Sequence, residues 1–403
     1  MEQVLYQLPD GWEWLSVKKL SHNIQYGHTA KAESNGNAKF LRITDIQNGK
    51  IDWQGVPTVS LKEKEIRKYA LNDNDLVFAR SGATAGKSIL IKNAPTDAVF
   101  ASYLIRITPN QEKIVPEYLS YFFLTPAYWE VVGLNAAGAA QPNINGTKLS
   151  EFIVPIAPRE EQKRIVEKLD ALLTRIDTAI EHLQESISLA DALYASTINE
   201  QMKLAIEQIG LSKVEEHIVQ IQTGTTPPTK QPDFYDDGDI NWFSPSDFGD
   251  HDILTNSNKK LSQKAFDAGK ARKFDAGTVL LVAIGATIGK IGYLERDASS
   301  NQQITGMKFS KDIMPRYAYY WFRFIKPEIL ANASTATLPI INQKGIKELS
   351  FCAPGAELQK AICNKIDEVS LFRKNVRAEL IEKVDLMRSL KASILDSAFK
   401  GEL

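Results

Sequence analysis

The chain has 403 residues, of which 43% are apolar and 24% charged, so its composition excludes a disordered or collagen-like protein and fits two or three globular domains. Its 48 basic and 49 acidic side chains give a formal net charge of −1, which argues against a protein that coats nucleic acid through its overall charge. With 2 cysteines and 5 histidines, a disulfide framework and a cysteine-rich zinc site are excluded, and no metal site is expected.

No apolar stretch approaches the ~18 residues that a membrane span needs. Pro9, Asp10 and Gly11 stand where a signal peptide would carry its apolar segment. We therefore expect a cytoplasmic protein that makes no membrane contact.

Short strand-like runs open the chain. Residues 40–46, 76–79 and 88–91 are rich in apolar side chains and are separated by Gly, Pro and Asn. At residues 116–123 a proline precedes several aromatic residues, a pattern that favours a helix packed into the core over a platform on which bases stack. Together these elements predict a mixed α/β domain.

A long helix is predicted from Glu160. Between Val166 and Tyr194 its apolar positions alternate in spacings of three and four, which is a heptad seam of about four heptads. No Pro or Gly interrupts it before Gly210, so at ~1.5 Å per residue the helix reaches roughly 60 to 70 Å. Such a seam requires a partner helix.

The second half of the chain repeats the first. Gly27 and Lys163 recur 197 residues later as Gly224 and Lys360, and collinear matches extend over about 185 residues. A Gly-Ala-Thr-x-Gly-Lys loop occurs in both halves, at residues 82–87 and 285–290. A second long helix, with a less regular seam, is predicted at about residues 359–399.

The two predicted helices can bury each other's apolar seams if they pair antiparallel. Such a pairing relates the two halves of the chain by a pseudo-two-fold axis. A homodimeric coiled coil competes with this solution, but it leaves two seams per chain to satisfy. We predict an α+β fold with two homologous mixed α/β domains, residues 1–157 and 210–354, and two long helical segments, residues 158–209 and 355–403. Inverted copies of one domain suit the reading of two separated stretches of duplex DNA.

Several motifs resemble a known family. Leu-Pro-Asp-Gly-Trp at 8–12, Gln-Pro-Asn-Ile-Asn at 141–145, the run at 156–165 and the ending at 393–403 are similar to the specificity subunit of type I restriction-modification enzymes. The resemblance covers the whole chain. The second copy departs from it at residues 354–359, where one extra residue separates the proline from the glutamine that opens the helix.

The resemblance implies a non-catalytic DNA-binding subunit with two target recognition domains, each reading one part of a bipartite site in double-stranded DNA. It also implies that the coiled coil spaces these domains and docks two methyltransferase subunits, and that restriction and translocase subunits join the full complex. This chain is then expected to bind no cofactor, whereas S-adenosylmethionine, ATP and Mg²⁺ belong to the partner subunits.

The glycine-rich loop does not fit a nucleotide site. A phosphate-binding loop needs four residues between its glycines, and Gly82 and Gly86 enclose three. We expect a turn between two strands, with Lys87 and Lys290 contacting DNA phosphates beside it.

Features common to both domains cannot distinguish two half-sites, so base readers are sought where the copies diverge. Arg and Lys suit guanine, and Asn suits adenine. The candidate readers are Lys31, Arg42, Asn48 and Arg80 in the first domain and Lys230, Asn241, Arg272 and Lys273 in the second. The candidate partner-docking residues lie on the acidic face of the first long helix, and they are Glu160, Glu161, Glu167 and Asp170.

No catalytic signature accompanies these features, so the chain is expected not to be an enzyme. Two other interpretations stay open at this point. One is a coiled-coil assembly scaffold without DNA contact, and the other is a nucleotide-binding enzyme that uses the Gly-Lys loops.

Overall fold

A computed structural model describes residues 3, 5–47, 49–136, 143–249, 253–334 and 338–403. Contacts divide the chain into two compact units: Met1–Gln184 with Ile381–Leu403, and Glu185–Leu380. Each unit contains a mixed α/β part, which we call its head, and a stretch of two long helices. These helices are α6, Arg159–Ile209, and α11, Ala356–Lys400.

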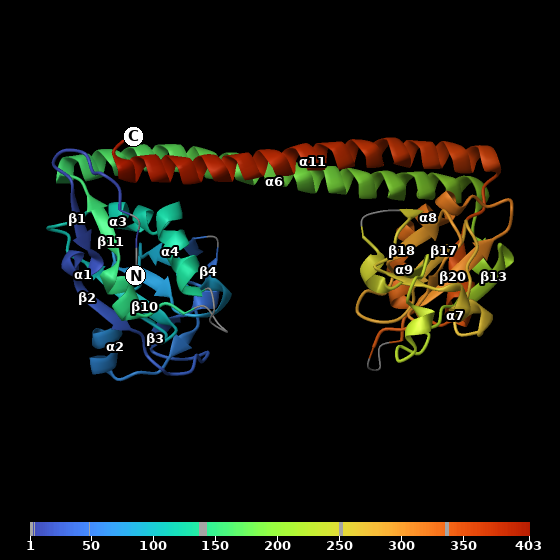
Figure 1. Cartoon of the computed structure of the whole chain (residues 1–403), viewed down its shortest axis with the longest axis horizontal. Helices are drawn as coiled ribbons and strands as arrows, with labels where there is room; N and C mark the ends of the chain where they lie inside the picture. Colours follow the sequence, from blue (N-terminus) through green and yellow to red (C-terminus); the bar gives the residue numbers. More distant parts are fainter. Residues whose placement is uncertain (1–2, 4, 48, 137–142, 250–252, 335–337) are drawn as a thin grey trace. The chain divides into compact units, whose positions relative to one another are not determined.

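The helices α6 and α11 lie side by side and antiparallel, which confirms the predicted pairing (Figure 1). In the first unit Leu169 of α6 belongs to the same buried cluster as Leu395 of α11, and Lys391 pairs with Asp177 at 2.7 Å. In the second unit Arg377 pairs with Asp191 at 3.0 Å. Each head therefore shares one hydrophobic core with its own stretch of the helix pair.

The first head is built on small sheets. β1 (Glu13–Ser16) pairs with β11 (Ile153–Ile156), and β2 (Ser21–Tyr26), β10 (Leu104–Pro109), β7 (Leu76–Ala79) and β8 (Ser88–Leu90) form an antiparallel sheet in that order. A further sheet has the order β6 (Thr58–Val59), β3 (Ala38–Leu41) and β9 (Ala98–Phe100), and β4 (Ile46–Gln47) pairs with β5 (Lys50–Ile51). The helices are α1 (Val17–Leu20), α2 (Glu63–Tyr69), α3 (Pro116–Phe122), α4 (Pro126–Ala136) and α5 (Gly146–Glu151).

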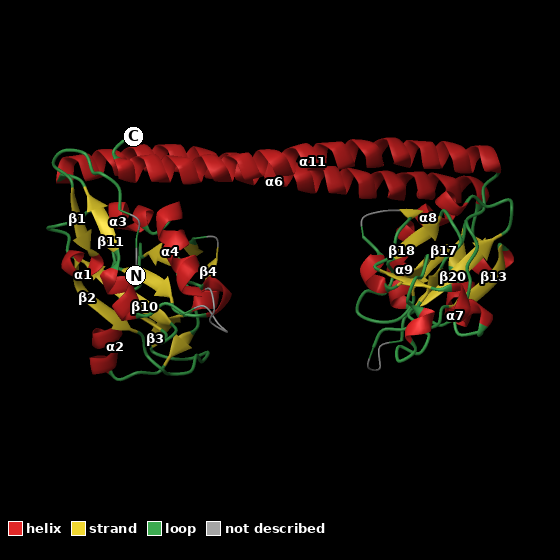
Figure 2. Cartoon of the chain, in the orientation of Figure 1, coloured by secondary structure: helices red, strands yellow, loops and turns green. Residues whose placement is uncertain are grey.

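The second head is likewise a mixture of helices and strands (Figure 2), and it repeats most of this topology with one more strand in its main sheet. Its main sheet has the order β13 (Ile218–Thr223), β20 (Ile304–Phe309), β17 (Val279–Val282), β18 (Ile291–Leu294) and β15 (Ile253–Leu254). The smaller sheets are β16 (Lys259–Leu261), β14 (Ile240–Phe243) with β19 (Ser299–Ser300), and β12 (Ser212–Lys213) with β21 (Ser350–Phe351). The helices are α7 (Gln263–Asp267), α8 (Pro315–Phe324), α9 (Lys326–Ala331) and α10 (Gln343–Glu348).

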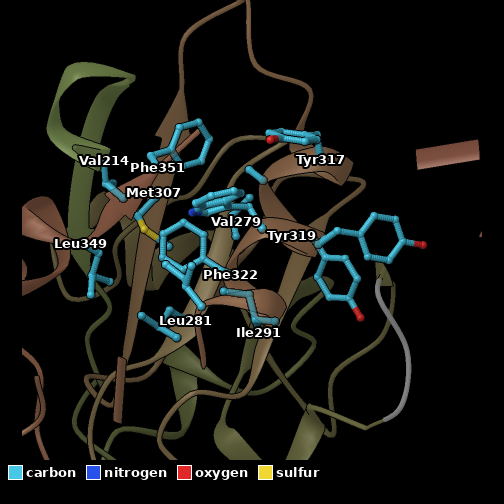
Figure 3. Packing of buried hydrophobic residues seen from close by; sticks show 14 of the residues in the cluster. Val214, Val279, Leu281, Ile291, Met307, Tyr317, Tyr319, Phe322, Leu349 and Phe351 are labelled. Atoms are coloured by element: carbon cyan, nitrogen blue, oxygen red, sulfur yellow. The ribbon is translucent and has the colours of Figure 1, made fainter. Parts of the chain in front are cut away.

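The aromatic runs form core helices, as the sequence predicted. α3 and α8 each begin at the expected proline, a residue whose fixed φ suits the first helical turn. In α8 the side chains of Tyr317, Trp321 and Phe322 are buried, and they pack with Phe351 against the main sheet (Figure 3). These rings are therefore not available as a surface for base stacking.

A buried glutamine fixes the start of each long helix to its head. Gln162 accepts a hydrogen bond from Val115 N and donates to Ala157 O, both at 2.8 Å. Its counterpart Gln359 accepts from Met314 N at 2.8 Å and donates to the carbonyls of Asp312 and Pro354. Gln162 and Gln359 are 1% and 0% exposed, so their amide groups form hydrogen bonds with the protein and not with water.

The extra residue in the second copy is absorbed before its helix begins. α6 starts directly after Pro158, whereas α11 starts at Ala356, so Gly355 is inserted between Pro354 and the helix. Gln162 N bonds to Pro158 O, and Gln359 N bonds to Gly355 O. The glutamine therefore occupies the same place in the first turn of both helices.

The two main sheets differ at their centres. In the first head Asp75 and Arg106, 2% and 8% exposed, approach to 3.8 Å, and Arg106 also bonds to Gln25. Burial raises the pKa of Asp75 and lowers that of Arg106, because charge is costly in a low-dielectric interior. The corresponding positions in the second head are Thr278 and Gly306.

In the second head the ring of Phe274 lies where the first head has the Arg106 side chain. A Cβ atom added at Gly306 would lie 2.4 Å from the Phe274 ring and 3.0 Å from Thr278. The same arrangement of strands thus surrounds a buried Asp–Arg pair in the first head and a phenylalanine ring in the second.

No helix in the described ranges combines the length and the apolar character that a membrane crossing requires.

We predict that Gln162→Ala and Gln359→Ala each lower the free energy of unfolding by ~1–3 kcal/mol, because each substitution leaves buried backbone groups without hydrogen-bond partners. Urea unfolding followed by circular dichroism measures this loss. The matched control is Gln208→Ala, an exposed glutamine on α6. An equal effect of all three substitutions would contradict the anchoring role.

Candidate nucleic-acid interface

The glycine-rich loop is a packed turn between two strands in each head. Residues 82–84 form a 3-10 turn between β7 and β8, and Gly82 and Gly86 have φ angles of 82° and 87°, which glycine adopts without strain. Gly86 N bonds to Ala79 O, and Lys87 N bonds to Thr84 O. Because these amides already bond within the turn, the loop lacks the open cradle of amides with which a phosphate-binding loop holds a nucleotide.

The two lysines that follow the turns occupy different environments. Lys87 is exposed to solvent. Lys290 is partly buried, and its ammonium group donates to Phe248 O at 3.0 Å and lies 3.5 Å from Pro245 O. The phosphate contact stays a prediction for both lysines, but Lys290 also holds the segment that follows β14.

Four loops of the first head converge on one groove of about 480 Å³. Lys31 follows β2, Arg42 follows β3, Ser81 follows β7, and Tyr103 lies in the turn between β9 and β10. Arg42 Nη2 donates to Asp45 Oδ1 at 2.7 Å, and 43% of its side chain stays exposed. The groove thus presents two cations, a hydroxyl and an aromatic ring, which are groups that bind phosphates and base edges.

Arg80, the neighbour of Ser81, is held over an aromatic ring. Its guanidinium carbon lies 5.2 Å from the centroid of Tyr26, a cation–π geometry. The Tyr26 hydroxyl accepts a hydrogen bond from Gly146 N at 2.9 Å. Asn48, the remaining candidate reader of this head, lies outside the described residues.

The candidate readers of the second head are not brought together in the same way. Lys230 is exposed, but Asn241 donates to Thr255 O at 2.7 Å and Arg272 to Thr223 O at 2.6 Å. Lys273 pairs with Asp297 at 2.7 Å, and this hydrogen bond raises the pKa of Lys273. The last three side chains therefore support the loops of their own head.

Several surface residues were missed by the sequence reasoning. Tyr103 is 66% exposed, and its only sequence signal is an aromatic residue within a turn. In the second head the adjacent Lys259 and Lys260 line a depression of about 460 Å³ together with Tyr235. A pair of exposed lysines on β16 was visible in the sequence, but nothing there showed that an aromatic ring lies beside them.

The acidic candidates on α6 divide into two groups. Asp170 accepts a hydrogen bond from Tyr121 of the head, and Glu161 accepts one from Trp12 Nε1 at 3.2 Å. Burial, followed by the bond to Asp170, raises the pKa of Tyr121, so that its hydroxyl stays a donor. These two carboxylates orient the head, whereas Glu160 pairs with Lys163 of the same helix at 2.8 Å and Glu167 is exposed, and both remain predictions as docking residues.

The family described as type I restriction modification DNA specificity domain matches residues 9–189 and 214–384. The chain is 25% identical to a putative type I restriction enzyme MjaX specificity subunit of Methanocaldococcus jannaschii, across 94% of this chain and 91% of that one. It is 24% identical to the StySPI specificity subunit of Salmonella potsdam, across 98% and 90%.

Two solved structures share the fold. A chain from a study of the assembly and conformational transition of the type I R-M system aligns with a TM-score of 0.76 and 18% identity, covering 99% of this chain and 100% of that one. The HsdS subunit of Thermoanaerobacter tengcongensis aligns with a TM-score of 0.51 and 18% identity, covering 99% of both.

The chain belongs to the type I restriction modification DNA specificity domain family, because the family matches both repeats and most of the sequence. It is the non-catalytic DNA specificity subunit of a type I restriction-modification complex, in a family whose members typically bind no cofactor themselves. This identity confirms the resemblance and overturns the two alternatives, a scaffold without DNA contact and a nucleotide-binding enzyme.

We predict that Lys87→Ala weakens binding to all duplexes alike and lowers the slope of log affinity against log salt by about one, because one phosphate contact is lost. Lys290→Ala should instead lower the thermal midpoint with a smaller change in salt slope. Fluorescence anisotropy at several salt concentrations and thermal unfolding separate the two effects. Loss of preference at a single base pair in the Lys87 variant would contradict a phosphate contact.

Proposed function

We propose that each head reads one half of a bipartite site in double-stranded DNA, and that the helix pair docks two methyltransferase subunits. The observation that carries this proposal is the duplication: two homologous heads, each attached by an equivalent buried glutamine to a long helix. A duplicated reader suits a site with two parts, since each copy can diverge in base preference while it keeps the same attachment.

The first head supports DNA contact most directly. Lys31 and Arg42 border its groove, and exposed Lys87 follows the adjacent turn. Contacts between such cations and DNA phosphates supply affinity, and contacts with base edges in the DNA grooves supply sequence preference. Since the whole chain carries a net charge of −1, DNA must be attracted by this local arrangement and not by overall charge.

Docking of the methyltransferase is supported by the helix surface that the heads leave uncovered. Glu160 and Glu167 are exposed on α6, on the turns that carry the buried residues Ile165 and Val166. A carboxylate on an exposed helix face is available to a basic partner surface. We assign S-adenosylmethionine, ATP and Mg²⁺ to the methyltransferase and to the restriction and translocase subunits of the cytoplasmic complex.

The bipartite proposal predicts modular recognition. Replacing residues 211–353 with the matching segment of a relative should change one half of the methylated site and leave the other half intact. Both ends of the exchange lie beside long helices, so the buried contacts within each head stay together. Sequencing of methylated positions in cells that also express the methyltransferase measures the result. A change in both halves would show that the heads do not read separately.

The docking proposal predicts a change in stoichiometry. Glu160→Lys combined with Glu167→Lys should repel one methyltransferase, so that the purified complex holds one methyltransferase per specificity subunit and not two. Light scattering after size-exclusion chromatography gives the mass of the complex. Glu215→Lys, at an exposed glutamate of the second head, is the control and should leave the mass unchanged. Two bound methyltransferases in the double variant would place the docking surface elsewhere.

A further inference from the structure

The turn that carries Tyr103 is held rigidly in the first head. Ala101 N bonds to Leu41 O, Arg80 N to Tyr103 O, and Leu104 N to Ala101 O, each at 2.9 Å. Tyr103 is nevertheless 66% exposed, a larger fraction than that of any other aromatic residue in the described ranges. A fixed backbone thus presents a ring to solvent beside the cations of the groove.

The second head builds the same turn with other side chains. Asn301 N bonds to Phe243 O at 2.9 Å, Ala283 N to Gln303 O at 2.8 Å, and Ile304 N to Asn301 O at 3.2 Å. These three bonds match those of the first head one for one. Gln303 therefore corresponds to Tyr103, and Gln302 corresponds to Ser102.

The outward side chain differs between the two turns. Gln303 is partly buried, and its amide oxygen accepts a hydrogen bond from Asn301 Nδ2 at 3.1 Å. Gln302 is exposed, and its amide oxygen accepts from the Thr226 hydroxyl. The first head thus presents a phenol from its turn, and the second presents a carboxamide whose orientation is fixed by Thr226.

These two groups are suited to different base edges. A tyrosine ring makes apolar contact with a thymine methyl or stacks on a base, and a glutamine amide pairs with the edge of adenine. The rest of the groove diverges as well, since Arg42 and Ser81 correspond to Ser244 and Ile284.

We propose that Tyr103 and Gln302 are specificity-determining residues, Tyr103 contacting a base pair of one half-site and Gln302 a base pair of the other. This inference rests on the proposed function, in which each head reads its own half-site. Neither residue is required for the attachment of the heads to the helices, which involves α3 and α8.

The test uses the complex with its own methyltransferase, expressed in cells without other DNA methylation, and sequencing of the methylated positions. Tyr103→Ala should relax the choice of base at one position of one half-site, with discrimination falling roughly tenfold. Gln302→Ala should do the same in the other half-site only. Tyr103→Phe, which keeps the ring, should retain more preference than Tyr103→Ala.

The control is Val219→Ala, since Val219 is 69% exposed on β13 of the second head, outside both turns and outside the helix pair. It should leave the methylated sequence unchanged. Unaltered sites in both turn variants, or an equal loss of methylation at all sites, would overturn the inference. If the unsubstituted complex methylated no bipartite site, the proposed function itself would fail, so the two failures are distinguishable. Thermal midpoints equal to that of the unsubstituted protein show that the variants are folded.

Discussion

The apolar seam of α6 is the constraint on which the rest of the structure depends. A helix of 51 residues with an apolar stripe is unstable alone in water, and most of its stability must come from packing against a partner. α11 supplies that partner within the same chain, and each head adds its own core to the pair, as the shared clusters around Leu169 and Ile366 show. The helices thereby become part of two hydrophobic cores, one in each unit.

The contacts that attach each head to its long helix are equivalent in the two heads. Gln162 and Asp170 contact α3 or the chain just before it, and Gln359 and Asp367 make the equivalent contacts at α8. These contacts recur because both heads must join a helix in the same way. The loops at the strand ends carry no such requirement, so their side chains are available to diverge.

Much of the fold follows from the sequence because the repeat and the heptad seam are long, periodic signals. The helix pair was predicted from them, whereas the aromatic core helices and the turn nature of the glycine-rich loop were predicted from local proline and glycine patterns. Individual contacts were not, because a charged side chain looks the same in a sequence whether it faces solvent or a backbone carbonyl. Lys87 and Lys290 illustrate this, since one is exposed to solvent and the other, at the matched position of the repeat, donates to a backbone carbonyl.

The unlike centres of the two main sheets restrict how such a gene recombines. A crossover between the halves inside a sheet would bring Arg106 into a head without Asp75, and a buried charge that loses its partner costs about 3–5 kcal/mol. A side chain at the position of Gly306 would also overlap Phe274. Crossovers near the glutamines separate no such partners. Recombination between related genes should therefore exchange whole heads, because a head assembled from parts of both copies would lose a buried partner or gain an overlap.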